Sequence, residues 1–453
     1  MKRNANLLDG PIFPALSALA LPIMATSFIQ MAYNLTDMIW IGRIGSGAVA
    51  SVGAAGMFMW FSNGLATLAK MGGQIKVGQA LGADQKEEAR IYAANSFRMA
   101  ILFALAFGLI SILCGKMMIS FFHLNSAQVI SDAQNYLFVT CGLVIFSFLN
   151  QIYTGILTAM GNSKASFVAT TIGLVLNIVL DPLLIFGFGV IPALGVLGAG
   201  IATVAAQAVV TLLFVLIVRG DTILFDHFHL LGSLSKKHSK EIFRIGLPTA
   251  LQSMLFSCIS MFIARIIADW GDGAVAVQKV GSQIESISWM TSEGYAAALN
   301  SFVAQNYGAK NPQRIHYGYR LSMTMMLVWG LLCSAMLIVF PEFIFHIFIQ
   351  ESDVLPMGVD YLRILGVSQL FMCMEITTAG AFDGLGKTLP PSIISITLTS
   401  ARIPMAYALQ KVWGLNGIWW SITISSILKG TILFQWFRFV IHKDPFFHPN
   451  SEN

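Results

Sequence analysis

The stretch Val77-Gly-Gln-Ala-Leu-Gly-Ala83 recurs later in the chain as Val303-Ala-Gln-Asn-Tyr-Gly-Ala309, at an offset of 226 (303 − 77). Other short motifs recur at the same offset or at one less, namely Leu21-Pro22 as Leu247-Pro248, Gly47–Ala50 as Gly273–Ala276, and Gly155 and Gly161 as Gly380 and Gly386. Several motifs in one register are typical of an internal duplication. The chain is therefore expected to contain two copies of one structural unit.

Between these motifs the chain is unusually apolar. Of its 453 residues 56% are hydrophobic and only 11% are charged, whereas soluble domains carry roughly 25% charge. The formal charge of +5 is spread among short segments between apolar runs. It therefore reports membrane topology rather than nucleic-acid binding. These features predict a polytopic membrane protein.

Twelve apolar segments are long enough to cross a bilayer as helices. They are residues 13–41, 50–75, 93–119, 131–158, 166–190, 193–218, 242–268, 277–303, 318–345, 358–383, 392–410 and 415–440. Lys and Arg concentrate in alternate loops, which predicts that both termini are cytoplasmic. The predicted fold is all-α, with two parallel six-helix repeats related by a pseudo-twofold axis along the membrane normal.

The duplication divides the chain into predicted domains. Residues 1–220 form an N-terminal six-helix lobe, residues 221–241 a cytoplasmic linker, and residues 242–453 a C-terminal lobe with a short tail. The linker contains His227 and His229, but no further metal ligands stand near them, so a solvated segment is expected rather than a metal site. Five cysteines without CxxC spacing are expected to be small buried hydrophobic residues.

Two carboxylates occur in the first copy alone. Asp37 falls on Ile263 in the second copy, and Asp181 falls on Ala406. Placing an ionised Asp at the centre of a bilayer costs about 3 kcal/mol or more, so such an acid indicates a functional site. The alternative is a structural hydrogen-bond cluster that joins the first and fifth spans.

The neighbours of these acids are polar and occur at helical spacing. Gln30, Tyr33, Asn34 and Asp37 share one helix face in the first span. In the fifth span Asn177 precedes Asp181 by four residues, and in the sixth Thr203 lies near the middle. Hydroxyl and amide groups both donate and accept hydrogen bonds, which suits a carboxylate that alternates between charged and protonated forms.

Embedded charges in the second copy are interpreted mainly as ion pairs. They are Arg265, Lys279, Glu285, Glu293, Glu375, Asp383 and Arg402. Arg402 is a candidate partner for Glu375 or Asp383, and Glu375 is also a candidate second site for a cation or drug. The 22 Met and 33 Phe residues favour a soft, adaptable cavity wall.

The repeated motifs and the Asn177–Pro182 segment resemble the MATE (multidrug and toxic compound extrusion) family over essentially the whole chain, and its DinF-like prokaryotic branch in particular. The resemblance implies cation-coupling acids in an N-lobe cavity, with a polar network and further lining residues. In this chain these are Asp37 and Asp181 as acids, Tyr33, Asn177 and Thr203 as network, and Gln30 and Asn150 as lining. The NorM-like branch uses acids on spans seven and ten, but residues 247–268 contain none, which leaves Glu375 alone.

The expected function is that of a secondary antiporter in the bacterial inner membrane. As a monomer it would export cationic or amphipathic drugs in exchange for H⁺, with Na⁺ as the alternative coupling ion. No cofactor, nucleic-acid partner or enzymatic activity is expected. A lipid-linked oligosaccharide flippase remains the alternative, because Arg265, Lys279 and Arg402 would suit its head group. A membrane-embedded enzyme fits less well, since His123, His316 and His346 are scattered near span ends. A channel fits less well because the repeat and the paired acids are less typical of one.

Overall fold

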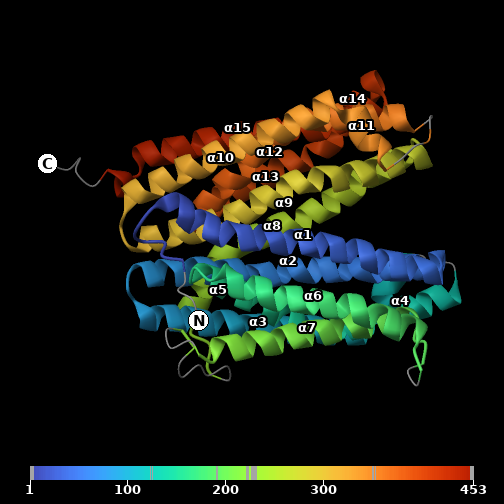
Figure 1. Ribbon diagram of the computed structural model, residues 1–453, viewed down its shortest axis with the longest axis horizontal. Coiled ribbons are helices and arrows are strands. Elements are labelled where there is room, and N and C mark those ends of the chain that lie inside the picture. Colours follow the sequence, from blue (N-terminus) through green and yellow to red (C-terminus); the bar gives the residue numbers. More distant parts are fainter. Residues whose placement is uncertain are drawn as a thin grey trace. The chain divides into compact units, whose positions relative to one another are not determined.

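The structure is a computed structural model that describes residues 5–122, 124, 126–189, 192–220, 224–225, 232–348, 351 and 354–448. Much of the predicted linker, with Asp226, His227 and His229, lies outside the described residues, as does His123. The regular elements of the described part are all helices (Figure 1). They therefore confirm the prediction of an all-α protein.

Each predicted span coincides with one helix or with a pair of helices. The helices are α1 (Ile12–Ile44), α2 (Ser46–Gly82), α3 (Lys86–Ser120), α4 (Ala127–Gly142), α5 (Ile145–Ala159), α6 (Ser163–Phe186), α7 (Val196–Val218), α8 (Lys236–Ala268), α9 (Asp272–Gly308), α10 (Pro312–Val339), α11 (Pro341–His346), α12 (Leu355–Gly384), α13 (Leu389–Ser400), α14 (Arg402–Trp413), α15 (Leu415–Lys443) and a 3₁₀ turn, η1 (Pro445–Phe447). The predicted fourth span is two helices, α4 and α5, that meet at 43°.

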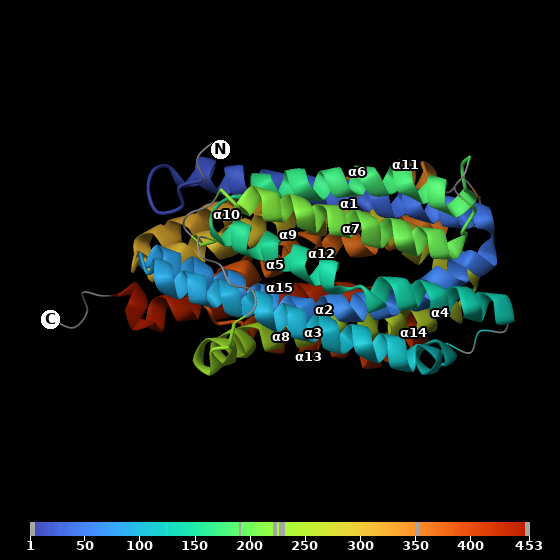
Figure 2. The ribbon, with the colours of Figure 1, turned by 90° about the horizontal axis from the view of Figure 1, so that it is seen from below.

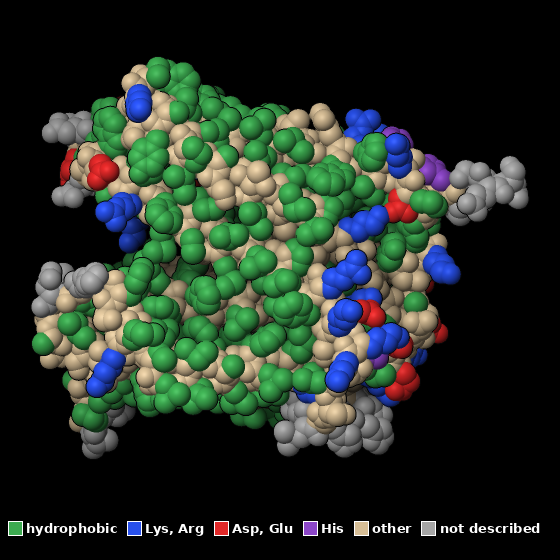
Figure 3. All heavy atoms as spheres, turned by 180° about the vertical axis from the view of Figure 1, so that it is seen from behind, with side chains coloured by type: hydrophobic (Ala, Val, Ile, Leu, Met, Phe, Trp, Pro, Cys, Tyr) green, Lys and Arg blue, Asp and Glu red, His purple; other side chains and the backbone are tan. Residues whose placement is uncertain are grey.

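Ten helical segments are long and apolar enough to cross a membrane, and the bent pair α4 and α5 makes an eleventh, among the residues that the structure describes. The one predicted span not among these is the eighth, residues 277–303, which corresponds to α9. This helix has 37 residues and carries Lys279, Glu285 and Glu293. Figure 3 shows hydrophobic side chains over the middle of the helices and most charged side chains near the helix ends. This distribution is the one expected of a multi-pass membrane protein.

The described chain forms two compact units that exchange helix halves. One unit contains residues 25–250, and the other contains residues 6–24 together with the chain from Leu251 onward. The divisions fall after Met24 and after Ala250, which are equivalent positions of the repeat, each two residues beyond a helix-interior proline. The predicted lobes follow the sequence repeat, and the compact units differ from them in two helix halves. The first half of α1 belongs to the unit of the second copy, and the first half of α8 belongs to the unit of the first copy.

Glycines allow these exchanged halves to pack closely. In the first unit a Cβ atom on Gly246 of α8 would lie 1.9 Å from the carbonyl oxygen of Leu68 on α2. In the second unit a Cβ on Gly294 of α9 would lie 2.5 Å from Cγ of Met24 on α1. No side chain larger than hydrogen fits at such separations, so helix packing explains these small residues.

The repeated motif ends α2 and α9 in the same backbone turn. The amide of Ala83 donates to the carbonyl of Gln79 at 3.0 Å, and the amide of Ala309 donates to that of Gln305 at 2.9 Å. The next residues, Asp84 and Lys310, have φ of 57° and 54°, the two positive values among non-glycine residues in the described chain. The sequence duplication is thus a duplication of structure.

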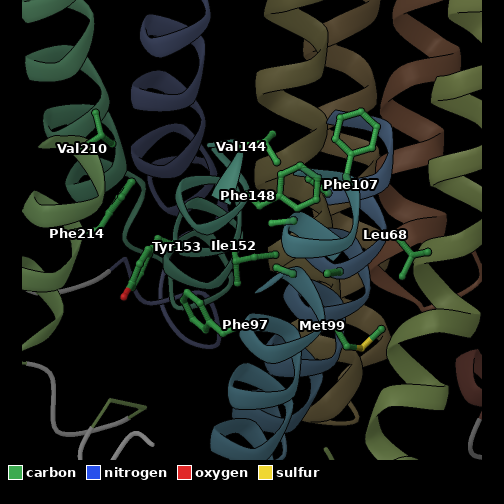
Figure 4. Close-up of a cluster of buried hydrophobic side chains, with 14 of the residues drawn as sticks. Leu68, Phe97, Met99, Phe107, Val144, Phe148, Ile152, Tyr153, Val210 and Phe214 are labelled. Carbon is green, nitrogen blue, oxygen red and sulfur yellow. The ribbon is translucent and has the colours of Figure 1, made fainter. Parts of the chain in front are cut away.

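An aromatic cluster holds the helices of the first unit together (Figure 4). The rings of Phe97 on α3 and Tyr153 on α5 lie 4.6 Å apart, edge to face. Tyr153 also stacks on Phe214 of α7, with ring centroids 5.3 Å apart. Figure 2 shows α6 and α7 side by side, with α5 between them and α3. The cluster fixes α5 and α7, which contribute to the cavity described below.

The close approach at Gly246 is tested by adding one methyl group. Gly246→Ala should lower the melting temperature of the purified protein, because overpacking against the Leu68 carbonyl costs about 1–3 kcal/mol. Gly53→Ala is the matched control, since a Cβ there meets no atom within 4 Å. Equal melting temperatures for the two variants, measured by thermal denaturation in detergent, would contradict this packing.

Candidate functional site

The first unit contains a cavity of about 230 Å³ among α1, α2, α5, α6 and α7. Most of its lining side chains are amides or hydroxyls, which provide hydrogen-bond donors and acceptors. The lining residues are Gln30, Tyr33, Lys70, Ser147, Asn150, Gln151, Thr154, Thr170, Gly173, Leu174, Asn177, Thr203, Ala206, Gln207 and Val210. None of these described lining residues is Met or Phe, so the expected Met- and Phe-rich wall is wrong for this cavity.

Five of the predicted network residues lie at this cavity, namely Gln30, Tyr33, Asn150, Asn177 and Thr203. Asn150 also joins α5 to α7, because its amide donates to the carbonyl of Gln207 at 2.9 Å and accepts from the hydroxyl of Thr211 at 2.8 Å. Asn34 is not among the lining residues. Its side chain is exposed, and its carbonyl oxygen accepts a 3.4 Å hydrogen bond from Gln30.

The two acids meet next to the cavity without lining it. The carboxyl groups of Asp37 and Asp181 lie within hydrogen-bonding range of each other. Asp181 is fully buried, and its Oδ1 accepts a 2.7 Å hydrogen bond from the amide of Asn177, which does line the cavity. Asn177 therefore connects the acid pair to the cavity.

Two oxygen atoms of this acid pair have no hydrogen-bond donor in the described part of the surrounding protein. Oδ1 of Asp37 and Oδ2 of Asp181 are both buried, and neither has a donor among the described protein groups around them. A hydrogen bond between two carboxyl groups exists only when one of them is protonated. Like charges at such short range also oppose ionisation of both groups. The geometry thus suits a pair that holds one proton and can release it.

Two tyrosines and a threonine surround the pair. The hydroxyl of Thr203 on α7 interacts with those of Tyr33 on α1 and Tyr136 on α4. Thr203 also donates to the carbonyl of Ala199 at 3.0 Å. Tyr136 was not predicted, because a single tyrosine in an apolar span carries no signal that it faces the acids. Pro182, directly after Asp181, lies inside α6 and leaves one backbone carbonyl without its helical donor.

Lys70 on α2 lines the cavity and was not predicted from the sequence. It lies inside the predicted span 50–75, about three turns before the end of α2 at Gly82. An ionisable residue within a span is itself a signal of a functional site. Its stem packs on α5, where a Cβ on Gly155 would lie 3.0 Å from Cγ of Lys70.

Glu375 lies in the other unit and forms an ion pair there. Its Oε1 is 3.0 Å from Nζ of Lys429 on α15, and both side chains are buried. The guanidinium of Arg402, the expected partner, interacts electrostatically with Glu375, but it donates hydrogen bonds to the hydroxyls of Ser425 and Ser426, at 2.6 and 3.2 Å. Lys429 lies in a polar part of the twelfth span. The sequence pattern does not show that this part of α15 faces α12, so the ion pair with Glu375 could not be predicted.

The described residues contain no group of three or more His, Cys, Asp or Glu side chains that could hold a metal ion. Five cysteines are free thiols in the structure, and Cys141 and Cys373 are buried as expected. The expectation of burial is wrong for Cys258, which is exposed, while Cys114 and Cys333 are half-buried.

The profile of the MatE family matches residues 22–183 and, separately, residues 248–408. The chain belongs to the MatE family. The two matches begin at an offset of 226 (248 − 22) and end at an offset of 225 (408 − 183). These are the offsets of the internal repeat, so each copy corresponds to one MatE unit.

Named MatE relatives cover nearly the whole chain. The probable multidrug resistance protein NorM of Thermotoga maritima is 28% identical over 428 residues, which are 92% of this chain and 90% of the relative. The FAD transporter of Shewanella oneidensis is 24% identical over 438 residues, 95% of each chain. A crystal structure of a MATE transporter in the bent conformation is 26% identical, covers 96% of this chain and 97% of that one, and has a TM-score of 0.88. This MatE protein is therefore a multi-pass membrane transporter of the multidrug efflux type.

The acid pair is tested by its effect on stability. Asp37→Asn should retain most of the native melting temperature, because the amide can donate to the remaining Asp181 carboxylate. Asp37→Leu should lower it, since leaving a buried charged acceptor without a donor costs about 1–3 kcal/mol or more. Equal melting temperatures of the two variants in thermal denaturation would contradict direct contact between the acids.

Proposed function

We propose that this protein is a proton-coupled antiporter of the bacterial inner membrane, with both termini in the cytoplasm, that exports cationic or amphipathic drugs by alternating access. The observation that supports the proposal most directly is the contact between Asp37 and Asp181 beside a polar cavity. The drug-resistance role of the NorM relative from T. maritima agrees with it.

Antiport follows when proton and drug exclude one another. A ligand shifts a conformational equilibrium only by its different affinities for the two states, and such coupling is reciprocal. A cationic drug in the cavity favours ionised carboxylates nearby, so its binding releases the shared proton. Protonation from the outside removes that attraction, and the drug dissociates there. Asn177 carries the effect, because it contacts both Asp181 and the cavity.

The proton is the preferred coupling ion over Na⁺. Two carboxyl groups in hydrogen-bonding contact are satisfied by one proton. A metal cation between them would need them apart and would require further oxygen ligands. Glu375 is not proposed as a second cation site, because the ammonium of Lys429 already neutralises it.

A lipid-linked oligosaccharide flippase is the less favoured function. Recognition of a pyrophosphate requires several cationic donors around one site. Among the lining residues of the first-unit cavity, Lys70 is the sole Lys or Arg in the part of the chain that the structure describes. Arg402, in the other unit, is engaged with Ser425 and Ser426.

Transport into proteoliposomes tests the proposal. With a proton gradient imposed, proteoliposomes with wild-type protein should accumulate a cationic dye. Asp37→Asn or Asp181→Asn should reduce the amount of accumulated dye at least about tenfold. Asp132→Asn is the matched control, because Asp132 is a half-buried acid on α4 that accepts a hydrogen bond from Gln128 and does not line the cavity. Dye accumulation driven by a Na⁺ gradient alone would contradict the proton as coupling ion. Undiminished proton-driven accumulation in Asp37→Asn would contradict the acid pair as coupling site.

A further inference from the structure

The start of α8 contacts the first unit through the side chain of His238. Nε2 of this imidazole lies 2.8 Å from Oε2 of Glu88 in the first turn of α3, and Nδ1 lies 2.6 Å from the hydroxyl oxygen of Ser235. The His238 side chain is buried, and its ring packs edge to face on that of Tyr92, with centroids 4.8 Å apart. The contacts among His238, Glu88 and Ser235 are called the α8 latch below.

The backbone beside the α8 latch packs closely on α2 and α3. The amide of Ser235 donates to the side-chain carbonyl of Asn95 on α3 at 2.9 Å. One helical turn after His238, the carbonyl oxygen of Ile242 lies so near α2 that a Cβ on Gly72 would be 2.2 Å from it. The contacts of His238 therefore belong to a segment of α8 that is seated on the first unit.

The other ionisable groups around the latch contact one another. The hydroxyl of Tyr92 on α3 donates to Oε2 of Glu241 at 2.6 Å, and Nζ of Lys76 on α2 lies 2.5 Å from the same oxygen. Lys237 on α8 also interacts electrostatically with Glu241. Tyrosine, lysine and glutamate ordinarily titrate far from neutral pH, whereas histidine changes charge between about pH 5 and 8. A change of pH near neutrality therefore acts on these side chains through the imidazole of the latch.

The second unit holds its own exchanged helix half from the same position of the repeat. The counterpart of Glu88 is Arg314, at an offset of 226 (314 − 88). Its guanidinium donates to the carbonyl oxygens of Leu7, Asp9 and Gly10, which precede α1, at 3.1, 3.1 and 2.8 Å. Arginine stays charged at every physiological pH. Both copies thus anchor the entry to an exchanged half, but the first copy does so through a histidine.

Both protonation states of the imidazole fit the observed distances. In the neutral form Nε2–H donates to Glu88, and Nδ1 accepts from the hydroxyl of Ser235. In the charged form both nitrogens donate, and the contact with Glu88 becomes an ion pair. Hydrogen bonds between charged groups are stronger than those between neutral groups. The contact therefore persists in the neutral form and becomes tighter when His238 binds a proton.

We propose that Glu88 and His238 form a pH-sensitive latch on the first half of α8, which acidification of the cytoplasm tightens and alkalinisation loosens. A proton that binds better in the latched state stabilises that state by linkage. Since α8 passes from the first unit to the second after Ala250, cytoplasmic pH would set the stability of a helix that both units share. The inference goes beyond the proposed export function and requires neither the acid pair nor a drug.

Hydrogen–deuterium exchange of the full chain in detergent, at pH 6 and at pH 8, tests the latch. Each measured rate is divided by the intrinsic rate of the unstructured peptide at the same pH, which gives a protection factor. Peptides that cover residues 232–243 should be protected about threefold to fivefold more at pH 6 than at pH 8, the size expected of a partly exposed ion pair. Peptides from residues 6–14 are the internal control, because Arg314 keeps its charge and their protection should be equal at both pH values.

Two variants identify the groups responsible. His238→Gln should abolish the pH dependence, since glutamine keeps an amide that donates to Glu88 but does not titrate. Glu88→Gln should abolish or reverse it, because a protonated imidazole then lacks its anionic partner. His316→Gln is the matched control, since His316 is exposed on α10, and it should leave the ratio of protection unchanged.

The outcomes that would overturn the latch are specific. Equal protection of residues 232–243 at the two pH values in wild type would contradict it, as would greater protection at pH 8. Undiminished pH dependence in His238→Gln or in Glu88→Gln would contradict the assignment of these residues. A variant that fails to fold is recognised by lost protection in residues 6–14, and the other variant then makes the same comparison. The measurement uses no gradient and no drug, so its result is independent of the proposed antiport.

Discussion

The contact between the carboxyl groups of Asp37 and Asp181 is the constraint on which the first unit depends. Asp181 is fully buried and Oδ1 of Asp37 is buried too, so two such carboxyl groups in contact favour one shared proton. The surrounding groups satisfy the remaining polar atoms without removing that preference. Asn177 donates to one oxygen of Asp181, while Thr203 engages the hydroxyls of Tyr33 and Tyr136. Removal of the proton therefore forces a local rearrangement, which is the property a coupling site requires.

The duplicated scaffold explains how such a site is supported. Both copies end their second long helix in the same turn, at Ala83 and at Ala309, and both bring helices together at equivalent small residues. In the second unit two buried carboxylates have partners, Glu375 in Lys429 and Glu285 in Tyr361 and Gln369. The first unit instead leaves oxygens of its acids without donors among the described protein groups. The acids of the first copy thus have the features of a titrating site, whereas Glu375 and Glu285 of the second copy are held by partners within their own unit.

Much of this arrangement was predictable from the sequence, because comparing the two copies removes the residues that serve packing. Asp37 and Asp181 were identified by having no counterpart, and the twelve spans by their length and apolarity. Lys70 satisfies the same test against Ala296, but a lysine near the end of a span is hard to distinguish by sequence from the loop lysines that follow it, such as Lys86. Lys429 was unpredictable, because pairing it with Glu375 requires the relative rotation of α12 and α15. The exchange of the first halves of α1 and α8 was unpredictable too, since a repeat shows which segments are equivalent and not which of them pack together.

Proton release on drug binding tests the central claim most directly. Purified protein in weakly buffered detergent solution is mixed with a cationic drug, and a pH indicator reports the protons released while fluorescence reports the drug bound. Wild type should release close to one proton per bound drug, and the double variant Asp37→Asn with Asp181→Asn should bind drug without release. Drug binding without proton release in wild type, or undiminished release in the double variant, would contradict a proton shared by Asp37 and Asp181.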